Sequence, residues 1–276
     1  AVNVMTYDNY GNIKSKNGVA YTYGDGVWKD LLTKVGDETI SYDKQGNPTS
    51  YLGHTLTWEK GRQLKSFDNI SYTYNANGVR TSKTNNGLKH TYTLEGTKIL
   101  RETYGDNYIL VPVYDNEDSV CGIICNDVPY YFKKNLQGDI IAIVDKDAKE
   151  VARYSYDAWG ACTLVYYTNI IIAQLNPFRY RGYYYDIETN LYYLNSRYYD
   201  PAIGRFLNAD EAIFLKMDYI LYNLYKEQGE KIWENFNKPK EEQKWYYTNM
   251  YKATIMNTNE KEILFERYKD ILEKVF

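Results

Sequence analysis

Alternation of apolar and polar residues dominates the first 165 positions. Runs such as Thr91–Leu94, Tyr108–Val111 and Ile140–Val144 alternate in the two-residue period of a half-buried strand. Clusters of Asn, Asp and Gly separate these runs at about the spacing of consecutive hairpin strands, for example at Asn85-Asn86-Gly87 and Gly138-Asp139. The pattern predicts a mainly β fold, with residues 1 to about 165 as an antiparallel ribbon of hairpins.

The turns of this ribbon carry a repeated motif. It occurs as Tyr7-Asp8-Asn9-Tyr10-Gly11-Asn12, Tyr42-Asp43-Lys44-Gln45-Gly46-Asn47, Tyr74-Asn75-Ala76-Asn77-Gly78 and Tyr156-Asp157-Ala158-Trp159-Gly160. In such a motif Tyr ends a strand, Asp accepts hydrogen bonds from turn amides, and Gly takes the positive φ of a tight reversal. Each copy is predicted to be a hairpin corner, and the repetition indicates one repeated supersecondary unit.

From about Ala212 the apolar period changes to that of a helix. Ile213, Ile220-Leu221 and Leu224 recur at three to four residues, and so do Ile263-Leu264 and Ile271-Leu272. Three or four short helices are expected in a tail, residues 211–276. The tail contains no histidine, which excludes histidine-dependent nuclease chemistry there. It is either a small toxin or partner-binding module, or a helical cap on the ribbon. Its aromatic residues could form a contact face for a partner, but at such spacing they more often form the core of a small bundle: Trp233, Trp245, Tyr246, Tyr247 and Tyr251.

Tyrosine accounts for 33 of the 276 residues, against 8 Phe and 5 Trp. A tyrosine side chain has an apolar ring and a polar hydroxyl group, so it favours surfaces that are only partly exposed to water. Two explanations are open: exposed rings stack on sugars, which would make this a carbohydrate-binding cell-surface module, or they form cross-strand ladders without a ligand. A formal net charge of -3 supplies no excess positive charge for phosphate, so no nucleic-acid partner is expected.

Cysteine and histidine are scarce. Cys121 and Cys125 are four apart, and Cys162 makes the number odd, which favours plain thiols over a zinc or redox site. His54 and His90 each lie beside Thr in a strand-like run, where a structural placement is expected. We therefore predict no metal and no cofactor, and the absence of a long apolar run predicts no membrane span.

The most specific stretch runs from Asn176 to Asp210. It includes Pro177-Phe178-Arg179-Tyr180-Arg181-Gly182-Tyr183-Tyr184-Tyr185-Asp186 and Ser196-Arg197-Tyr198-Tyr199-Asp200-Pro201-Ala202-Ile203-Gly204-Arg205-Phe206. Together with the Tyr-Asp corners upstream, it closely resembles the core domain of the Rhs, or YD-repeat, family. The resemblance covers residues 1 to about 210. It implies a YD-repeat ribbon at 1–165, an Rhs core domain at 166–210 and a variable tail at 211–276.

The resemblance implies a structural function. Proteins of this family wind a β-ribbon into a hollow shell, the core domain plugs one end, and the segment after it is often a toxin. Relatives include the C components of insecticidal toxin complexes, wall-associated polymorphic toxins and teneurins. We therefore expect a secreted or cell-surface bacterial protein that encloses or displays a C-terminal effector. The expected partners are upstream repeats that cover the open edge at Ala1, the chain's own tail as cargo, and an immunity protein or a cell-surface glycan.

The predicted site residues come from the same stretch. Most are expected to anchor the plug: Arg179, Arg181, Tyr183, Arg197, Tyr199, Asp200, Gly204, Arg205, Phe206 and Asp210. In many family members the core domain also cleaves the chain after itself, and Arg197, Asp200 and Asp210 are the catalytic candidates for such an aspartyl autoprotease. In the alternative, Arg197 and Arg205 pair with Asp200 or Asp210, and no bond is cut. Here Asp210 is followed by Glu211-Ala212-Ile213, which departs from the self-cleaving pattern, so a non-enzymatic role is predicted.

Overall fold

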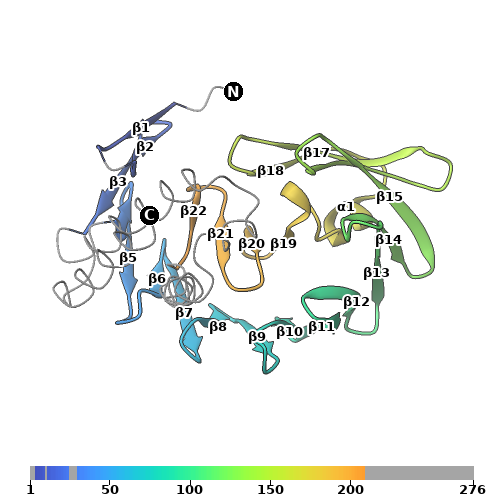
Figure 1. The fold of residues 1–276 in the computed structure, drawn as a ribbon, viewed down its shortest axis with the longest axis horizontal. Helices are drawn as coiled ribbons and strands as arrows, with labels where there is room; N and C mark the ends of the chain where they lie inside the picture. Colours follow the sequence, from blue (N-terminus) through green and yellow to red (C-terminus); the bar gives the residue numbers. More distant parts are fainter. Residues whose placement is uncertain (1–3, 10, 25–29, 209–276) are drawn as a thin grey trace, which may run out of the picture. The chain divides into compact units, whose positions relative to one another are not determined.

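The computed structural model describes residues 4–9, 11–24 and 30–208 (Figure 1). Contacts divide the chain into one unit that contains Met5–Asp37 and another that contains Glu38–Ala209. The smaller unit has the strands β1 (Met5–Tyr7), β2 (Ile13–Lys16), β3 (Val19–Tyr23) and β4 (Leu32–Val35), each paired antiparallel with the next. The predicted helical tail, 211–276, lies outside the described residues.

The larger unit is a continuous antiparallel meander in which each strand from β5 to β18 pairs with the next. This confirms the predicted fold class. The strands are β5 (Glu38–Tyr42), β6 (Pro48–Tyr51), β7 (His54–Glu59), β8 (Gln63–Phe67), β9 (Ile70–Tyr74), β10 (Arg80–Asn85), β11 (Leu88–Glu95), β12 (Lys98–Tyr104), β13 (Tyr108–Tyr114), β14 (Val120–Cys125), β15 (Val128–Lys134), β16 (Ile140–Val144), β17 (Glu150–Tyr156) and β18 (Cys162–Tyr167).

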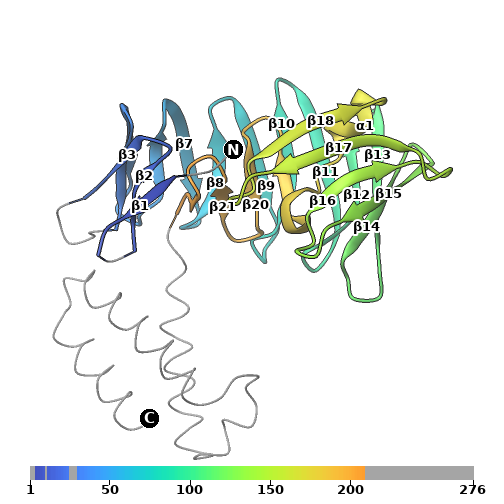
Figure 2. The ribbon, with the colours of Figure 1, turned by 90° about the horizontal axis from the view of Figure 1, so that it is seen from above.

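After β18 the chain turns back along the ribbon. It forms the helix α1 (Ile170–Leu175) and a short 3-10 turn at Tyr180–Gly182. A small antiparallel sheet of β19 (Tyr184–Asp186), β20 (Leu191–Tyr193), β21 (Tyr198–Asp200) and β22 (Arg205–Phe206) follows. Within this unit the ribbon curves around the small sheet (Figures 1 and 2). We call residues 176–208 the core segment. Of the described residues, none form a helix long and apolar enough to cross a membrane.

The predicted corners are confirmed in atomic detail. Asp43 Oδ1 accepts hydrogen bonds from the amides of Gln45 (2.8 Å) and Asn47 (2.9 Å), and Gly46 takes a φ of 79°. Asn75 and Asp157 accept the equivalent pairs of amides in their own corners. The same geometry recurs at positions that carry weaker motifs, Asp115, Asn135 and Asp145. An Asx side chain at the strand end thus sets the turn, because it satisfies amides that the reversal leaves unpaired.

Many aromatic side chains at strand ends bind backbone carbonyls. The hydroxyl of Tyr74 donates to the carbonyl of Leu64 (2.9 Å), and that of Tyr156 donates to the carbonyl of Ile140 (2.6 Å). The indole of Trp58 does the same at Pro48 (2.6 Å), ten residues earlier. The rings therefore cover the sheet while their polar atoms satisfy carbonyls near the preceding corner, ten to sixteen residues earlier. This use explains much of the tyrosine content without a ligand.

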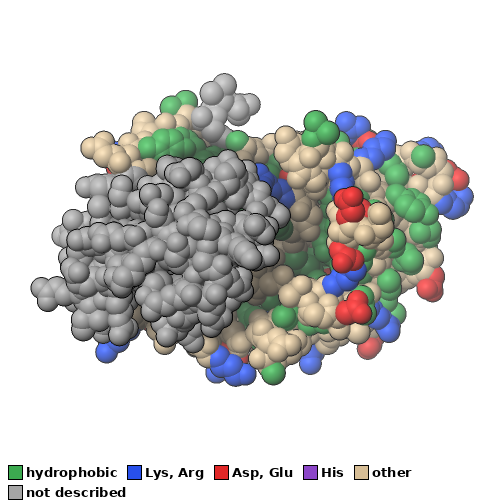
Figure 3. Space-filling model, viewed as in Figure 1, with side chains coloured by type: hydrophobic (Ala, Val, Ile, Leu, Met, Phe, Trp, Pro, Cys, Tyr) green, Lys and Arg blue, Asp and Glu red, His purple; other side chains and the backbone are tan. Residues whose placement is uncertain are grey.

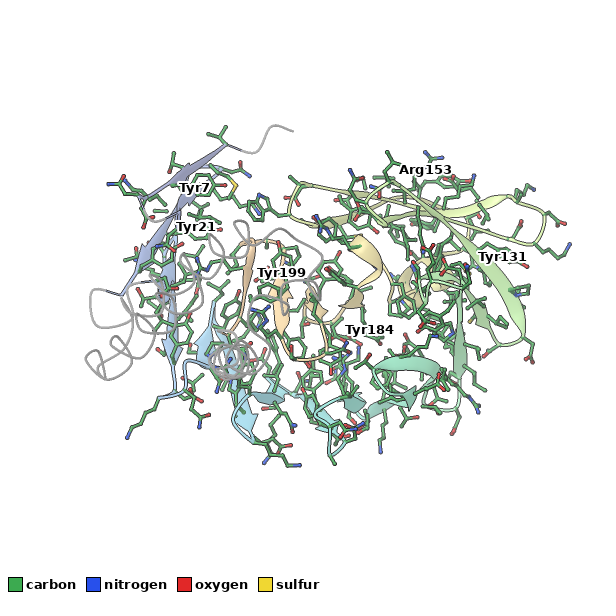
Figure 4. The ribbon with its side chains drawn as sticks, in the orientation of Figure 1. Tyr7, Tyr21, Tyr131, Arg153, Tyr184 and Tyr199 are labelled. Atoms are coloured by element: carbon green, nitrogen blue, oxygen red, sulfur yellow. The ribbon has the colours of Figure 1, made fainter. Side chains whose placement is uncertain are left out.

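A large apolar cluster of the larger unit lies between the inner face of β12 to β17 and the segment from α1 to Phe178. It is built from buried side chains such as Leu110, Ile123, Ile140, Ile143 and Ala173. Figure 4 places Tyr184 and Tyr199 inside the curve of the ribbon, and Tyr131 and Arg153 on its outer side. On the face seen in Figure 3, basic and acidic side chains are interspersed over the described surface.

Candidate functional site: the seat of the core segment

The first contact between ribbon and core segment is a buried ion pair. Arg80 opens β10 directly after the Asn75 corner, and Asp186 ends β19. Arg80 Nη1 lies 2.6 Å from Asp186 Oδ2 and Nη2 lies 3.1 Å from Oδ1, a bidentate pair. The two side chains are 1% and 0% exposed. A pair so fully removed from water needs close geometry to offset its desolvation, and this geometry provides it.

Further buried groups extend the pair into a cluster. Lys83 Nζ lies 3.0 Å from Asp186 Oδ1 and 2.8 Å from Glu188 Oε2. On the next strands, Glu102 accepts a hydrogen bond from the Tyr184 hydroxyl (2.6 Å) and lies 3.1 Å from His90 Nδ1. We call Arg80, Lys83, Glu102, Asp186 and Glu188 the charge cluster. The ribbon provides its cations and Glu102, and the core segment provides Asp186 and Glu188.

Aromatic rings enclose the Arg80 guanidinium. Its central carbon lies 4.3 Å from the ring centroid of Tyr193 and 4.9 Å from that of Tyr184, and the rings of Tyr72 and Tyr92 lie 5.5 and 5.3 Å away. Cation–π contacts of this kind are strongest when the cation is desolvated. Arg80 is thus held by one carboxylate and by rings from both the ribbon and the core segment.

The cluster shifts the titration of its members. Burial alone raises the pKa of the Asp186 carboxyl, but the charges of Arg80 and Lys83 and their hydrogen bonds lower it, and the net pKa is below the ordinary value. Burial lowers the pKa of Lys83, but Asp186, Tyr92 and Glu188 raise it, and the net pKa is raised. Burial, followed by the charge of Glu102, raises the pKa of Tyr184 well above its usual range, so its hydroxyl stays a donor.

A second contact lies at the corner Asp157–Ala161, which we call the Trp159 corner. Three successive carbonyls of this corner accept hydrogen bonds from tyrosine hydroxyls of the core segment. Tyr180 donates to Ala158 (3.3 Å), Tyr199 donates to Trp159 (2.9 Å), and Tyr192 donates to Gly160 (2.9 Å). The corner can present these carbonyls because Asp157 has taken up its amides.

Glycines make this contact close. A Cβ atom on Gly204, whose φ is 73°, would lie 2.9 Å from the Trp159 ring. A Cβ atom on Gly160 would lie 2.6 Å from the Tyr180 ring. Real Cβ atoms do not approach other atoms so closely, so these positions need glycine for both conformation and space. The turn between β21 and β22 is thereby packed directly on Trp159.

The corner at Asn135–Asp139 makes a third contact. Asp139 Oδ1 accepts a hydrogen bond from the amide of Arg181 (2.9 Å), and the amide of Ile140 donates to the carbonyl of Arg179 (3.1 Å). Arg181 has a φ of 52°, the left-handed conformation that is costly outside glycine. The ribbon therefore bonds the strained residue through its own amide and bonds the carbonyl of Arg179 just before the 3-10 turn.

Among the predicted anchors, Arg179 and Arg181 lie at the third contact, and Tyr183 bonds within the core segment. The buried Arg179 guanidinium lies 4.6 Å from the ring centroid of Tyr185 and 4.9 Å from that of Tyr154, and its Nη2 donates to the carbonyl of Ala173 (3.3 Å). The Arg181 guanidinium lies over the Tyr180 ring. The carbonyl of Tyr183 accepts a hydrogen bond from the amide of Arg179 (3.1 Å).

Two of the proposed catalytic candidates, Arg197 and Asp200, lie in the described residues. Asp200 is buried; its Oδ2 accepts from the Tyr51 hydroxyl (2.7 Å) and its Oδ1 from the amide of Ala202 (2.8 Å). Arg197 lies 3.8 Å above the Phe206 ring, and that ring packs against Tyr199. Arg205 is opposite Asp200 in the pairing of β21 and β22. Asp210 lies outside the described residues, so a carboxylate dyad stays a prediction.

Sequence reasoning did not select the ribbon side of the charge cluster. Lys83 and Glu102 lie outside the repeated motif, Arg80 follows the Asn75 motif but was not selected, and Asp186 was noted only as part of the core stretch. The sequence feature that could have identified the ribbon side of the cluster is a charged residue close to a corner, at a strand position where the alternating pattern expects a buried side chain. Over the residues that the structure describes, no group of His, Cys, Asp or Glu side chains is arranged to hold a metal ion.

A family model described as Teneurin YD-shell matches residues 4–232. The tRNA nuclease WapA of Bacillus subtilis (strain 168) is 39% identical over 220 residues, and the tRNA3(Ser)-specific nuclease WapA of Bacillus spizizenii is 38% identical over 220 residues. Each match covers 74% of this chain and 9% of the relative, so the chain spans a small part of those proteins.

Two solved structures share the fold of this chain. The crystal structure of TcdB2-TccC3-TEV aligns with a TM-score of 0.61 at 19% identity, over 76% of this chain and 12% of that one. The pore structure of the Photorhabdus luminescens Tc holotoxin, with the TccC3 mutation D651A, aligns with a TM-score of 0.61 at 20% identity and the same coverage. At this identity the likeness shows the fold alone.

Proposed function

The chain belongs to the Teneurin YD-shell family, and from that premise we propose that it is the closing part of a β-shell whose core segment plugs the ribbon and keeps a C-terminal effector enclosed. The membership confirms the resemblance to Rhs and YD-repeat proteins. The observation that carries the proposal is the charge cluster. Arg80 and Lys83 on the ribbon would be left as buried, unpaired cations if Asp186 moved away, so the plug is costly to displace.

Enclosure needs more ribbon than this chain contains. Each strand adds only about 4.8 Å of sheet width, and the matched relatives are far longer than the region that this chain matches. We therefore propose that upstream repeats complete the shell and that residues after the core segment are its cargo. The nuclease names of the relatives support an effector role for the whole protein, for which we propose a secreted or cell-surface location.

Protease protection tests enclosure. A chimera would join the repeats upstream of the matched region in Bacillus subtilis WapA to residue 4 of this chain, with an epitope after residue 276. We expect the epitope to survive proteolysis in the parent chimera and to be degraded in Asp186→Asn. Asp147→Asn is the matched control, because that side chain is 68% exposed. Equal degradation of the epitope in the parent and in a chimera lacking the core segment would contradict enclosure.

Asp200 is proposed to anchor the plug rather than to cut the chain, because both of its carboxylate oxygens accept hydrogen bonds. To test this role, the intact masses of the purified parent chain and of the Asp200→Asn variant would be measured after a day at neutral pH. One 32.5 kDa species in both supports anchoring. Two fragments from the parent alone would make the chain an aspartyl autoprotease. Carbohydrate binding stays a prediction from the tyrosine content, and no contact in the described residues favours it.

A further inference from the structure

The edge strand β18 differs from the rest of the ribbon in its lack of charge. Residues 158–178 contain no Asp, Glu, Lys or Arg, in a chain of which 25% is charged. β18 (Cys162–Tyr167) lies in the middle of this stretch. It pairs with β17, and the only other described element that packs closely on it is α1. Its second backbone edge therefore lies at the end of the meander (Figure 1).

The side chains beside this edge are apolar and exposed. Val165 is 51% exposed, Tyr166 45% and Tyr167 53%, and the first turn of α1 adds Ile170 and Ile171, at 38% and 47%. Soluble proteins usually protect such an edge with Lys, Pro or an inward charge. β18 has one protective device, a bulge at Val165, where its register with β17 shifts by one residue.

We propose that β18 is an interaction edge that pairs antiparallel with β18 of a second copy of this chain. An antiparallel pair of identical strands has a two-fold axis, so with the axis at the middle of β18 the central residues Leu164 and Val165 lie opposite themselves or each other. Charged residues at the middle of the strand would then lie next to like charges of the second copy, which destabilises a sheet. Because β18 carries no charge, self-pairing has no such penalty. The exposed apolar side chains of both copies are covered at the same time.

A comparison with β15 shows that exposed aromatic side chains alone do not make a strand an interaction edge. Tyr131 on β15 is 49% exposed, close to the value for Tyr166. β15 is paired on one side with β14 and on the other with β16, so its backbone has no open edge. Lys133 and Lys134 also flank that face. Tyr131 is therefore a matched control for an exposed tyrosine that cannot support strand pairing.

The oligomeric state of the purified chain tests the proposal. Multi-angle light scattering should give a mass twice that of the 32.5 kDa chain. Val165→Lys and Val165→Glu should each be monomeric, because each places two like charges across the two-fold axis. An equal mixture of the two variants should recover the dimer, since opposite charges then face each other. Tyr131→Lys should remain dimeric.

Several outcomes would overturn the proposal. A parent chain that stays monomeric up to its solubility limit would do so, and so would a Val165→Lys variant as dimeric as the parent. Failure of the mixed variants to associate would exclude pairing at this edge. Circular dichroism checks that each variant keeps its β signal. If Val165→Lys does not fold, Tyr167→Lys and Tyr167→Glu repeat the same series at a side chain that is 53% exposed.

Discussion

The charge cluster and the Trp159 corner hold the same core segment by different physics. At the charge cluster, Arg80 and Lys83 are buried against Asp186, with exposures of 3% or less. At the Trp159 corner, neutral tyrosine hydroxyls bind backbone carbonyls and a glycine turn packs on an indole ring. Removing one charge leaves another uncompensated, whereas removing one hydroxyl leaves only an unmet acceptor. The two contacts should therefore differ sharply in their sensitivity to single substitutions.

The largest effect is expected for Asp186→Asn. The substitution leaves Arg80 and Lys83 buried without their shared carboxylate, and should lower the free energy of unfolding by about 3–5 kcal/mol. Urea denaturation measures it, with the exposed Asp147→Asn as a control expected to change stability by less than about 0.5 kcal/mol. The double variant Arg80→Met/Asp186→Asn should be more stable than Asp186→Asn alone. If Asp186→Asn and Asp147→Asn lower the free energy of unfolding by the same amount, the charge cluster does not hold the core segment in place.

Gly204→Ala should have the next largest effect, about 1–3 kcal/mol, because the new Cβ meets the Trp159 ring at 2.9 Å. Gly87→Ala is the control that separates the steric overlap with the Trp159 ring from the backbone strain of a positive φ. Gly87 has a similar positive φ of 80°, and a Cβ there has nothing within 4 Å. Thermal or chemical unfolding of both variants should show Gly204→Ala to be the more destabilised. Equal losses would mean that the packing on Trp159 contributes little.

Acid should weaken the charge cluster before it affects the Trp159 corner. The folded-state pKa of Asp186 is lowered, so the unfolded chain binds the proton more readily, and stability is lost as the pH falls from about 3.9 through the folded pKa. One such proton gives a slope of at most about 1.4 kcal/mol per pH unit. Denaturation at several pH values should show the difference between the parent and Asp186→Asn shrinking in this window. A constant difference would contradict the assignment.

The smallest effect is expected for Tyr199→Phe, which removes the hydroxyl that donates to the Trp159 carbonyl (2.9 Å) but keeps the ring. The loss should be about 1 kcal/mol, the net value of a single neutral hydrogen bond. Tyr131→Phe is the control, since that ring is 49% exposed and on the outer side of the ribbon. A loss above about 3 kcal/mol for Tyr199→Phe would remove the contrast between the two contacts.

The sequence was sufficient for local structure. The corners at Asp43, Asn75 and Asp157 are read directly from the motif, since an Asx side chain and a glycine determine each turn from residues close in sequence. The contacts of the core segment are a different case. Arg80 and Asp186 are 106 residues apart, and a single sequence gives no indication that they meet.

Among the predicted site residues, Asp200 illustrates the same limit. Its presence in a tight turn was readable from Asp200-Pro201 and Gly204, and the structure has Gly204 at a φ of 73°. Its partner Tyr51 lies 149 residues away on β6 and belongs to no recognised motif. Turn chemistry is local, whereas the partners of a buried carboxylate depend on how the ribbon curves around the small sheet.

Hydrogen exchange of the intact chain tests most directly whether the charge cluster holds the core segment on the ribbon. The amides of β19, β20 and β21 would be followed in the parent and in Asp186→Asn, with β13 to β17 as the internal reference. We expect the variant to lose protection in the small sheet while β13 to β17 keep theirs. Unchanged protection of β19 to β21 in Asp186→Asn would contradict the account, because the core segment would then be held without its buried charges.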